Sequence, residues 1–381
     1  MLEVVFWTLV ILIGYVYFGY PALLYVLARG ASDEPNYGQS ELPHVTLLIS
    51  AFNEEDCIAE KLENSLLLDY PKGLLEIVVI SDASNDRTDD IVRGYADRGV
   101  KLLRMEERGG KTLGLNAGVN TARGEVIIFS DANAMYRQDA VRSLVAPYAD
   151  ENIGAVIGES TYIEPEDDSG RSESLYWRYE TAIKRYESEL GSVVGGDGAI
   201  YSVRKELFRP MSADALSDFV NPMQVVEQGK RCVYEPRAVS VEEVAGSFEK
   251  EFKRKVRIVN RAWRALWRLR NMLNPIRYGA FSLKLWSHKV LRWLVPFMLV
   301  VVFALNLTLV AQGPVYLASL ITQVIFYGLA TIGFLNRGRA EQPALLHIPC
   351  YFCLVNFACA MGLIEGISGK SYVTWATART D

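Results

Sequence analysis

Residues 45–55 read VTLLISAFNEE, a run of apolar and β-branched residues that ends in polar ones. Buried parallel strands have this composition. Three further runs of the same kind follow, at Glu76–Ser81, Val100–Met105 and Glu125–Ser130, and stretches of helical character separate the four, at Glu54–Leu68, Arg87–Asp97 and Lys111–Thr121. This alternation predicts an α/β domain with a mostly parallel sheet and right-handed crossovers.

Polar side chains follow the predicted strands at the points where they end. Asn53 follows the first strand, Asp82 the second, and Asp131 and Asn133 the fourth. Ligands of such sheets bind beyond the carboxyl ends of the strands, so we expect a site there. A nucleotide diphosphate can be held through a divalent cation with hard oxygen ligands, and Asp131 and Asn133 offer two of them.

Two other nucleotide-binding patterns are excluded. The stretch GGKT at residues 109–112 ends like a phosphate-binding loop, but Met105 stands where the first glycine of that loop is required. The turn after the first strand also lacks the G-x-G-x-x-G fingerprint of dinucleotide-binding domains. The sequence therefore does not predict a P-loop nucleotide triphosphatase or a dinucleotide-dependent enzyme.

The composition excludes further classes of protein. The chain has 381 residues, of which 50% are hydrophobic and 22% charged, with a net charge of −5. It is therefore neither disordered nor a globally basic binder of nucleic acid. Five cysteines in a chain of this length form no disulfide framework, and Cys350 and Cys353 lie in an apolar run where we expect buried thiols.

Long uncharged runs predict membrane-spanning helices, which need about 20 apolar residues each. These runs are Val4–Ala28, Trp293–Ala311, Gly313–Leu335 and Ala344–Ile364. A cleaved signal peptide is the alternative for the first run, and buried core helices are the alternative for all of them. Two arginines in the loop near 337–339 favour a cytoplasmic loop. Counting spans from it predicts a cytoplasmic α/β block, an external N-terminus and an external tail, unless one C-terminal segment is re-entrant.

The segment that precedes the second apolar run is strongly basic. Lys250–Arg277 contains ten Lys or Arg residues and one acid, and its apolar residues recur with helical spacing at Phe252, Val256, Val259, Trp263 and Leu266. A basic amphipathic helix beside a membrane span favours contact with anionic membrane lipids. A solvated charged helix is the alternative.

Several motifs occur in a fixed order over residues 45–245. After residues 45–55 come SDASND at 81–86, GK at 110–111, LNAG at 115–118, FSDAN at 129–133, GDGAIY at 196–201, SDF at 217–219 and GKRCVYEP at 229–236. In this order and spacing the chain resembles the family-2 glycosyltransferases of the GT-A fold. Its apolar runs are similar in layout to those of the cellulose-synthase-like and poly-N-acetylglucosamine-synthase-like branch. The resemblance implies a Rossmann-like α/β domain with transmembrane helices at both ends.

The resemblance also implies roles for individual residues. The donor would be bound by residues at the strand ends and at the following helix: Asn53, Glu55, Asp82, Lys111, Asp131 and Asn133. Asp82 would meet the base or ribose, and Asp131 would bind a divalent cation, Mg²⁺ or Mn²⁺, as the first acid of a D-x-D motif. Asn133 stands in place of the second acid. Glu55 is equally able to favour a helix N-terminus.

The acceptor side is implied in the same way. Gly196, Asp197 and Gly198 match the acceptor loop, and Asp218 matches the general base, although the acid that precedes it in the family is missing here. Arg261 and Trp263 stand in the region where processive members carry Q-x-x-R-W. The glutamine is absent, so transfer of a single sugar stays open beside polymer synthesis.

Together these observations predict a multi-pass protein of the cell (inner) membrane with a cytoplasmic catalytic domain. The expected domains are an anchor at 1–30, a glycosyltransferase domain at 45–245, interface helices at 248–285, three transmembrane helices at 290–367 and a tail at 368–381. We expect inverting transfer from a nucleotide sugar, of which a UDP-sugar is favoured, to a glycan or lipid-linked acceptor in exopolysaccharide or envelope glycan synthesis. Partner proteins of polysaccharide synthesis are compatible with this function. An inactive scaffold or a nucleotide-sensing subunit of a synthesis or transport complex is the alternative.

Overall fold

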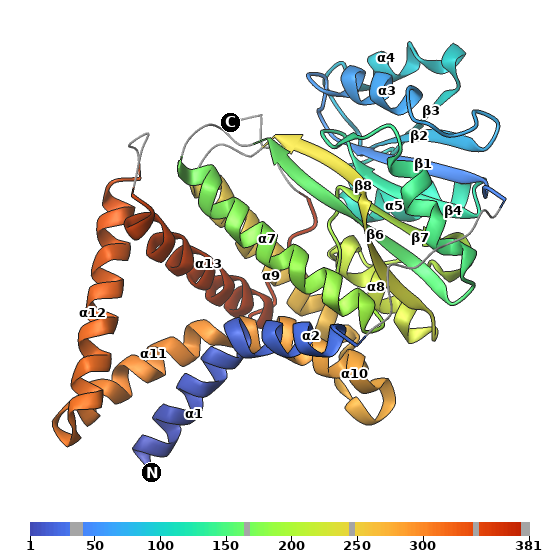
Figure 1. Cartoon of the computed structure of the whole chain (residues 1–381). Helices are drawn as coiled ribbons and strands as arrows, with labels where there is room; N and C mark the ends of the chain where they lie inside the picture. The colour runs from blue at the N-terminus through green and yellow to red at the C-terminus, as the bar shows by residue number, and fades with distance from the viewer. Residues whose placement is uncertain (31–40, 164–167, 244–247, 338–342, 375–381) are drawn as a thin grey trace.

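The computed structural model describes residues 1–30, 41–163, 168–243, 248–337 and 343–374. The described chain has two parts, an α/β block and a group of long helices at its side (Figure 1). Both chain ends contribute to the helical part, because the N-terminal helix and the C-terminal helices lie beside one another. The α/β domain with long helices at both ends of the chain, expected from the sequence, is thus present.

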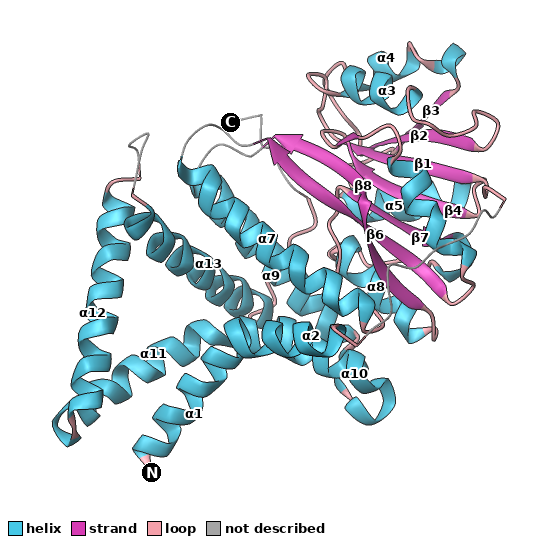
Figure 2. Ribbon diagram, viewed as in Figure 1, coloured by secondary structure: helices cyan, strands magenta, loops and turns pink. Residues whose placement is uncertain are grey.

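One mixed sheet organises the α/β block (Figure 2). In the described residues it contains eight strands in the order β3-β2-β1-β4-β7-β6-β8-β5. Their bounds are β1 Val45–Ala51, β2 Leu75–Ser81, β3 Val100–Arg104, β4 Val126–Asp131, β5 Met135–Tyr136, β6 Ile153–Ile163, β7 Ile200–Arg204 and β8 Arg231–Glu243. Strands β1 to β4 are parallel to one another, whereas β7 is antiparallel to both β4 and β6.

The first four strands and their helices follow the sequence prediction closely. The connecting helices are α3 Ile58–Leu66, α4 Thr88–Arg93 and α5 Lys111–Thr121. Alternate residues of β1 point to opposite faces, so that Ile49 packs with α3 and Leu48 packs with α5. Helix α5 approaches the sheet closely, because a methyl group on Gly118 would lie only 2.5 Å from Cδ1 of Ile80.

The second half of the block carries the acceptor-side motifs. Its helices are α6 Ala140–Val145, α7 Asp168–Glu189 and α8 Ser217–Glu227, and helix α9 Phe248–Arg268 follows β8. The sequence predicted only α9 among them. Its basic face and its buried residues Val256, Val259 and Leu266 agree with the amphipathic spacing.

Four described helices are long and apolar enough to cross a membrane. They are Leu2–Ala28, which comprises α1 Leu2–Gly14 and α2 Tyr20–Ala28; Pro275–Gln312, which comprises α10 Pro275–Leu285 and α11 Leu291–Leu309; α12 Pro314–Leu335; and α13 Ala344–Ile367. The rings of Phe6 and Tyr316 lie 5.5 Å apart, centroid to centroid. The N-terminus therefore lies beside the turn between α11 and α12.

Helix α13 packs along α9, with two glycines at the contact. A methyl group on Gly362 would lie 2.6 Å from the carbonyl oxygen of Val256, and one on Gly366 would lie 2.9 Å from the ring of Trp263. The chain then returns to the α/β block, where Nδ2 of Asn260 donates to the carbonyl of Lys370 at 3.1 Å. The described part of the tail thus lies on the side of the block.

The sequence left two arrangements open, an external tail and a re-entrant C-terminal segment. Three full crossings after the block would separate the tail from it, whereas the described tail contacts α9. The small residues of α13 pack against the basic α9. These contacts agree with the second arrangement.

Cysteine labelling can test this arrangement in intact cells. In a variant without the native cysteines, single cysteines at the exposed positions Asn85 and Ser371 should react with a membrane-impermeant maleimide to the same extent. A cysteine at Gln312, in the turn between α11 and α12, should react where these two are protected, or be protected where they react. Different labelling of positions 85 and 371 would contradict the side inferred for the tail.

A buried polar junction joins the helical part to the block. His288 lies between two acids of α7, with Nδ1 2.8 Å from Oε1 of Glu187 and Nε2 3.1 Å from Oε2 of Glu180. The hydroxyl of Tyr20 on α2 donates to Glu187 at 2.6 Å. Glu187 also accepts from the backbone N–H of Val194, two residues before Gly196. The junction therefore fixes the start of the predicted acceptor loop relative to the membrane helices.

Candidate functional site

Asp82, at the end of β2, is held by a glycine turn. Its carboxylate is buried and accepts hydrogen bonds from the backbone N–H groups of Gly109 at 2.8 Å and Gly110 at 2.9 Å. Gly110 has φ +86°, a conformation that glycine adopts without strain, and α5 begins at the next residue. This arrangement fixes Asp82 relative to Lys111.

Lys111, Asp131 and Asp218 converge on the backbone of Gly198. A methyl group built on Gly198 would lie 3.3 Å from Nζ of Lys111 and 3.8 Å from a carboxylate oxygen of each acid. Lys111 forms an ion pair with Asp131. The three side chains come from the start of α5, the end of β4 and the start of α8, so the fold brings together residues up to about a hundred positions apart.

Asp218 lies in an environment that favours its neutral form more than water does. Burial is the largest cause that raises the pKa of Asp218 to about 6; the charge of Asp197 contributes to this shift, and Lys111 opposes it. The backbone carbonyl of Asp218 accepts from the N–H of Gly196 at 2.8 Å. The predicted acceptor loop and the predicted base are thus directly joined.

Asn53 and Glu55 lie at the rim and tie the first two βα turns together. Oδ1 of Asn53 accepts from the N–H of Asn85 at 3.0 Å, and Asn53 itself has φ +53°. The carboxylate of Glu55 accepts from Nε and from the backbone N–H of Arg87. These contacts give both residues a structural role, and their predicted contact with the donor stays a prediction.

The residues present fit a divalent cation that a substrate helps to hold. Asp131 is about one third exposed in its side chain, and Asn133 lies two residues further, partly buried, before β5. Among the described residues no group of three or more His, Cys, Asp or Glu side chains is placed to hold a metal ion. Magnesium sites of this kind use one or two carboxylates and take further ligands from substrate phosphates.

Arg261 and Trp263 lie on different faces of α9. Nη2 of Arg261 donates to Oγ1 of Thr112 at 2.9 Å and to the carbonyl of Ala215, three residues before Asp218. Trp263 packs against Trp293 and Gly366 in the helical part. Two residues along a helix correspond to about 200° of rotation, so both cannot face the same site. Trp263 is thereby a packing residue here, and its predicted acceptor contact stays a prediction.

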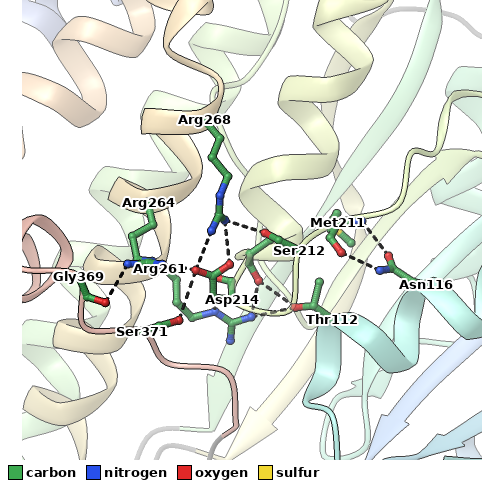
Figure 3. Close-up of polar contacts among 11 residues, drawn as sticks. Thr112, Asn116, Met211, Ser212, Asp214, Arg261, Arg264, Arg268, Gly369 and Ser371 are labelled. Atoms are coloured by element: carbon green, nitrogen blue, oxygen red, sulfur yellow. Dashed lines mark hydrogen bonds and ion pairs between the residues drawn. The ribbon is translucent and has the colours of Figure 1, made fainter.

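A network around Asp214 connects α9, α5 and the tail (Figure 3). Arg264 and Arg268 each form an ion pair with the Asp214 carboxylate at 2.8 Å, and Oγ of Ser371 donates to it at 3.3 Å. Burial would raise the pKa of Asp214, but the hydrogen bonds from Arg268 and Arg264 outweigh it and hold this pKa well below its usual range. The network holds the segment that leads into α8.

The described tail passes over the glycine turn that holds Asp82. A methyl group built on Gly110 would lie 2.4 Å from the carbonyl oxygen of Val373. The carbonyl of Gly369 accepts from Nη1 of Arg264 at 3.2 Å. The C-terminal segment after α13 is therefore part of the predicted donor side.

Sequence reasoning missed several of these residues. Asp214 and Thr112 carry no local signal, because each is a single polar residue whose partners come from other elements. The tail gave a weak signal in the sequence, the positive charges of Lys370 and Arg379, which disfavour an external position.

Comparisons with known proteins identify the domain. Residues 46–208 match the family described as Glycosyl transferase family 2. The chain is 34% identical to beta-monoglucosyldiacylglycerol synthase of Trichormus variabilis over 160 residues, which are 41% of this chain and 34% of that protein. It is 25% identical to poly-beta-1,6-N-acetyl-D-glucosamine synthase of Staphylococcus aureus over 242 residues, which are 62% of this chain and 58% of that protein. The matches thus span one third to just under two thirds of these relatives.

The whole chain is similar in structure to a solved protein. Mannosyltransferase PcManGT from Pyrobaculum calidifontis, in complex with GDP-Man and Mn²⁺, superposes with a TM-score of 0.73 and 23% sequence identity. The superposition covers 97% of this chain and 100% of that chain. It confirms the predicted GT-A fold with helices at both ends of the α/β block.

Proposed function

The chain carries a glycosyl transferase family 2 domain at residues 46–208, and on this basis we propose that it is a membrane-bound inverting glycosyltransferase. It transfers a sugar from a nucleotide-sugar donor to a glycan or lipid-linked acceptor. The catalytic block faces the cytoplasm, where nucleotide sugars are made available to it. The function serves the synthesis of a polysaccharide or of a glycolipid, the two product classes named for the relatives.

One observation carries this proposal. The ammonium group of Lys111 and the carboxylates of Asp131 and Asp218 surround the backbone of Gly198, and the pKa of Asp218 is raised. The three side chains come from three separate elements. An inverting transfer needs a base for the acceptor hydroxyl and positive charge for the departing diphosphate. A scaffold or a sensor has no use for a base with a tuned pKa beside the donor site.

The proposed mechanism assigns one task to each side chain. Asp82 contacts the base or ribose of the donor, and Lys111 balances the negative charge of the diphosphate. Asp131 would hold a divalent cation, which would supply further positive charge for the leaving group. Asp218 takes the proton of the acceptor hydroxyl while that oxygen attacks the anomeric carbon, and the nucleoside diphosphate leaves on the opposite face of the sugar.

The acceptor arrives from the membrane side of the block. Asp218 is tied to the acceptor loop through Gly196, and Arg261 of α9 bonds the residues just before α8. Helix α9 is basic and lies against α13, which supports contact with anionic lipids at the membrane surface. A lipid-linked acceptor or a growing glycan at that surface is thus within reach of the base.

Release of nucleoside diphosphate tests the function directly. Purified full-length protein in nanodiscs is incubated with UDP- and GDP-sugars, Mg²⁺ or Mn²⁺, and extracts of membrane lipids or oligosaccharides, and the products are sized. Acceptor-dependent release of diphosphate from one donor is the expected result. Donor binding without any turnover would favour the nucleotide-sensing alternative, and no binding of any nucleotide would favour an inactive scaffold.

The rate should depend on pH through Asp218. The base acts only when ionised, and its pKa is raised to about 6, so turnover should rise with pH through about 6 and level off above it. Asp197→Asn removes a charge that raises this pKa, and the acid limb should move to lower pH. Profiles of turnover against pH at saturating donor measure both effects, and an unchanged limb in the variant would contradict the coupling.

A further inference from the structure

Glu242 lies beside the predicted cation site although 111 positions separate it from Asp131 in the sequence. Strand β5 follows Asp131 within a few residues and pairs with the end of β8, with Met135 opposite Val241 and Tyr136 opposite Ser240. This pairing carries the end of β8 to the turn that contains Asp131 and Asn133. Glu242 is the next residue after the paired Val241.

The carboxyl group of Glu242 is buried at one oxygen and faces other acids. Its Oε1 is shielded from solvent and has no hydrogen-bond partner among the described residues, although the residue as a whole is partly exposed. Burial raises the pKa of Glu242, the charges of Asp197 and Asp131 contribute to this shift, and Arg254 and Lys111 oppose it. Glu242 therefore belongs to the same electrostatic site as Asp131.

The fully buried Lys61 does not pair directly with these acids. Lys61 lies fully buried with its ammonium group on the carbonyl of Ala134 and 3.9 Å from the ring centroid of Tyr136. Burial lowers the pKa of Lys61 to about 7, while the charges of Asp131 and Glu242 oppose the shift. Its ammonium group is directed at a carbonyl and an aromatic ring, and Asp131 pairs instead with Lys111.

A buried carboxylate oxygen without a donor is costly, because it has lost water and gained no hydrogen bond. Such an oxygen is satisfied when it binds a ligand of the protein, and neighbouring carboxylates bind divalent cations well. The D-A-N sequence at residues 131–133 supplies one carboxylate where a D-x-D motif supplies two. The carboxylate of Glu242 on β8 would bring the number of carboxylates at the site to two.

We propose that Glu242 acts with Asp131 as the second carboxylate for the divalent cation, in the role that an acid at position 133 would otherwise fill. The proposal rests on the glycosyltransferase function inferred above. It names a residue of β8 that no motif of the sequence marks. It also explains why the chain tolerates asparagine at position 133.

Binding of Mn²⁺ to the full-length protein in nanodiscs tests this role without turnover. Free Mn²⁺ is measured by electron paramagnetic resonance in the presence of saturating UDP or GDP, whichever binds the wild type. Glu242→Gln should weaken Mn²⁺ binding by at least about tenfold, since even outer-shell partners of a metal site are worth 10–100-fold. Adding Asn133→Asp to this variant should recover most of the loss, because it returns a carboxylate to the site.

Glu235→Gln is the matched control. It makes the same chemical change on the same strand, where Glu235 pairs with Arg237 at 2.7 Å, and it should leave Mn²⁺ binding unchanged. The metal-free Glu242→Gln protein should melt at the wild-type temperature or above, because the change removes repulsion between buried acids. A melting temperature at or above that of the wild type would indicate that the Glu242 carboxyl is not needed for folding, as expected of a metal ligand.

Three results would overturn the proposal. They are wild-type Mn²⁺ affinity in Glu242→Gln, failure of Asn133→Asp to restore the affinity lost, and loss of folding in Glu242→Gln, which would make the carboxyl a structural group. A wild-type protein that binds neither diphosphate with Mn²⁺ would instead contradict the proposed function itself.

Discussion

Asp218→Asn should lower the rate of sugar transfer by about 10²–10⁴-fold, the usual contribution of a general base. This corresponds to roughly 3–5 kcal/mol at 1.36 kcal/mol for each factor of ten. The variant keeps the size of the side chain and loses its ability to take the proton of the acceptor hydroxyl. Donor affinity should change little, because Lys111, Asp131 and Asp82 stay in place. Acceptor-dependent release of nucleoside diphosphate and calorimetric titration with the donor measure the two quantities.

Glu227→Gln provides the comparison for this variant. Glu227 lies at the other end of α8, where it accepts from Asn271 at 3.1 Å, and its replacement should leave turnover unchanged. Near-normal turnover in Asp218→Asn would exclude the residue as the base. A joint loss of donor binding and thermal stability would show that Asp218 holds the fold of the acceptor loop through the turn at Gly196.

Asp131→Asn should remove the dependence of donor binding on divalent cations and lower turnover by about 10²–10³-fold, since a cation at the leaving group contributes several kcal/mol. The fold should persist, because Asp131 lies at the end of β4 with a third of its side chain exposed. Lys111 loses its ion-pair partner in this variant but keeps its place at the start of α5. Titration of nucleoside diphosphate with and without Mn²⁺ measures the effect.

Asn133→Asp is the comparison for Asp131→Asn, because it adds a carboxylate to the turn from which Asp131→Asn removes one. It should leave the cation affinity equal to that of the wild type or raise it, because it adds a carboxylate beside Asp131. Unaltered, cation-dependent binding in Asp131→Asn would mean that this acid is no ligand. In that case the ion pair with Lys111 would be its only role.

The first half of the α/β block followed from the sequence, because its signals are local. Each of β1 to β4 is a short apolar run, and each strand end carries its polar residues within a few positions. Strands β1 to β4 run parallel because a helix connects each of them to the next. The second half did not follow in the same way, since β6, β7 and β8 pair in mixed directions that composition does not specify.

The site was predictable only where a motif stands at a strand end or a helix start. Asp82, Lys111, Asp131 and Asp218 are of this kind, and the structure brings the last three around Gly198. Arg261 was singled out by its resemblance to the arginine of Q-x-x-R-W, but its partner Thr112 lies 149 positions away. No pattern within α9 indicates which of Arg261 and Trp263 turns toward the block.

The sequence by itself determined the kinds of element: a parallel α/β start, a basic amphipathic helix and four apolar helices. These depend on which residues recur at a period of two or of 3.6, and that pattern is written locally. Only the tertiary structure decided how distant segments meet: the return of the tail to Gly110, the placing of α13 along α9, and the arrival of Glu242 beside Asp131. Apolar periodicity predicts that a face of a helix or strand is buried, but it does not predict which other element covers that face. Contacts between elements far apart in the chain therefore cannot be predicted from it.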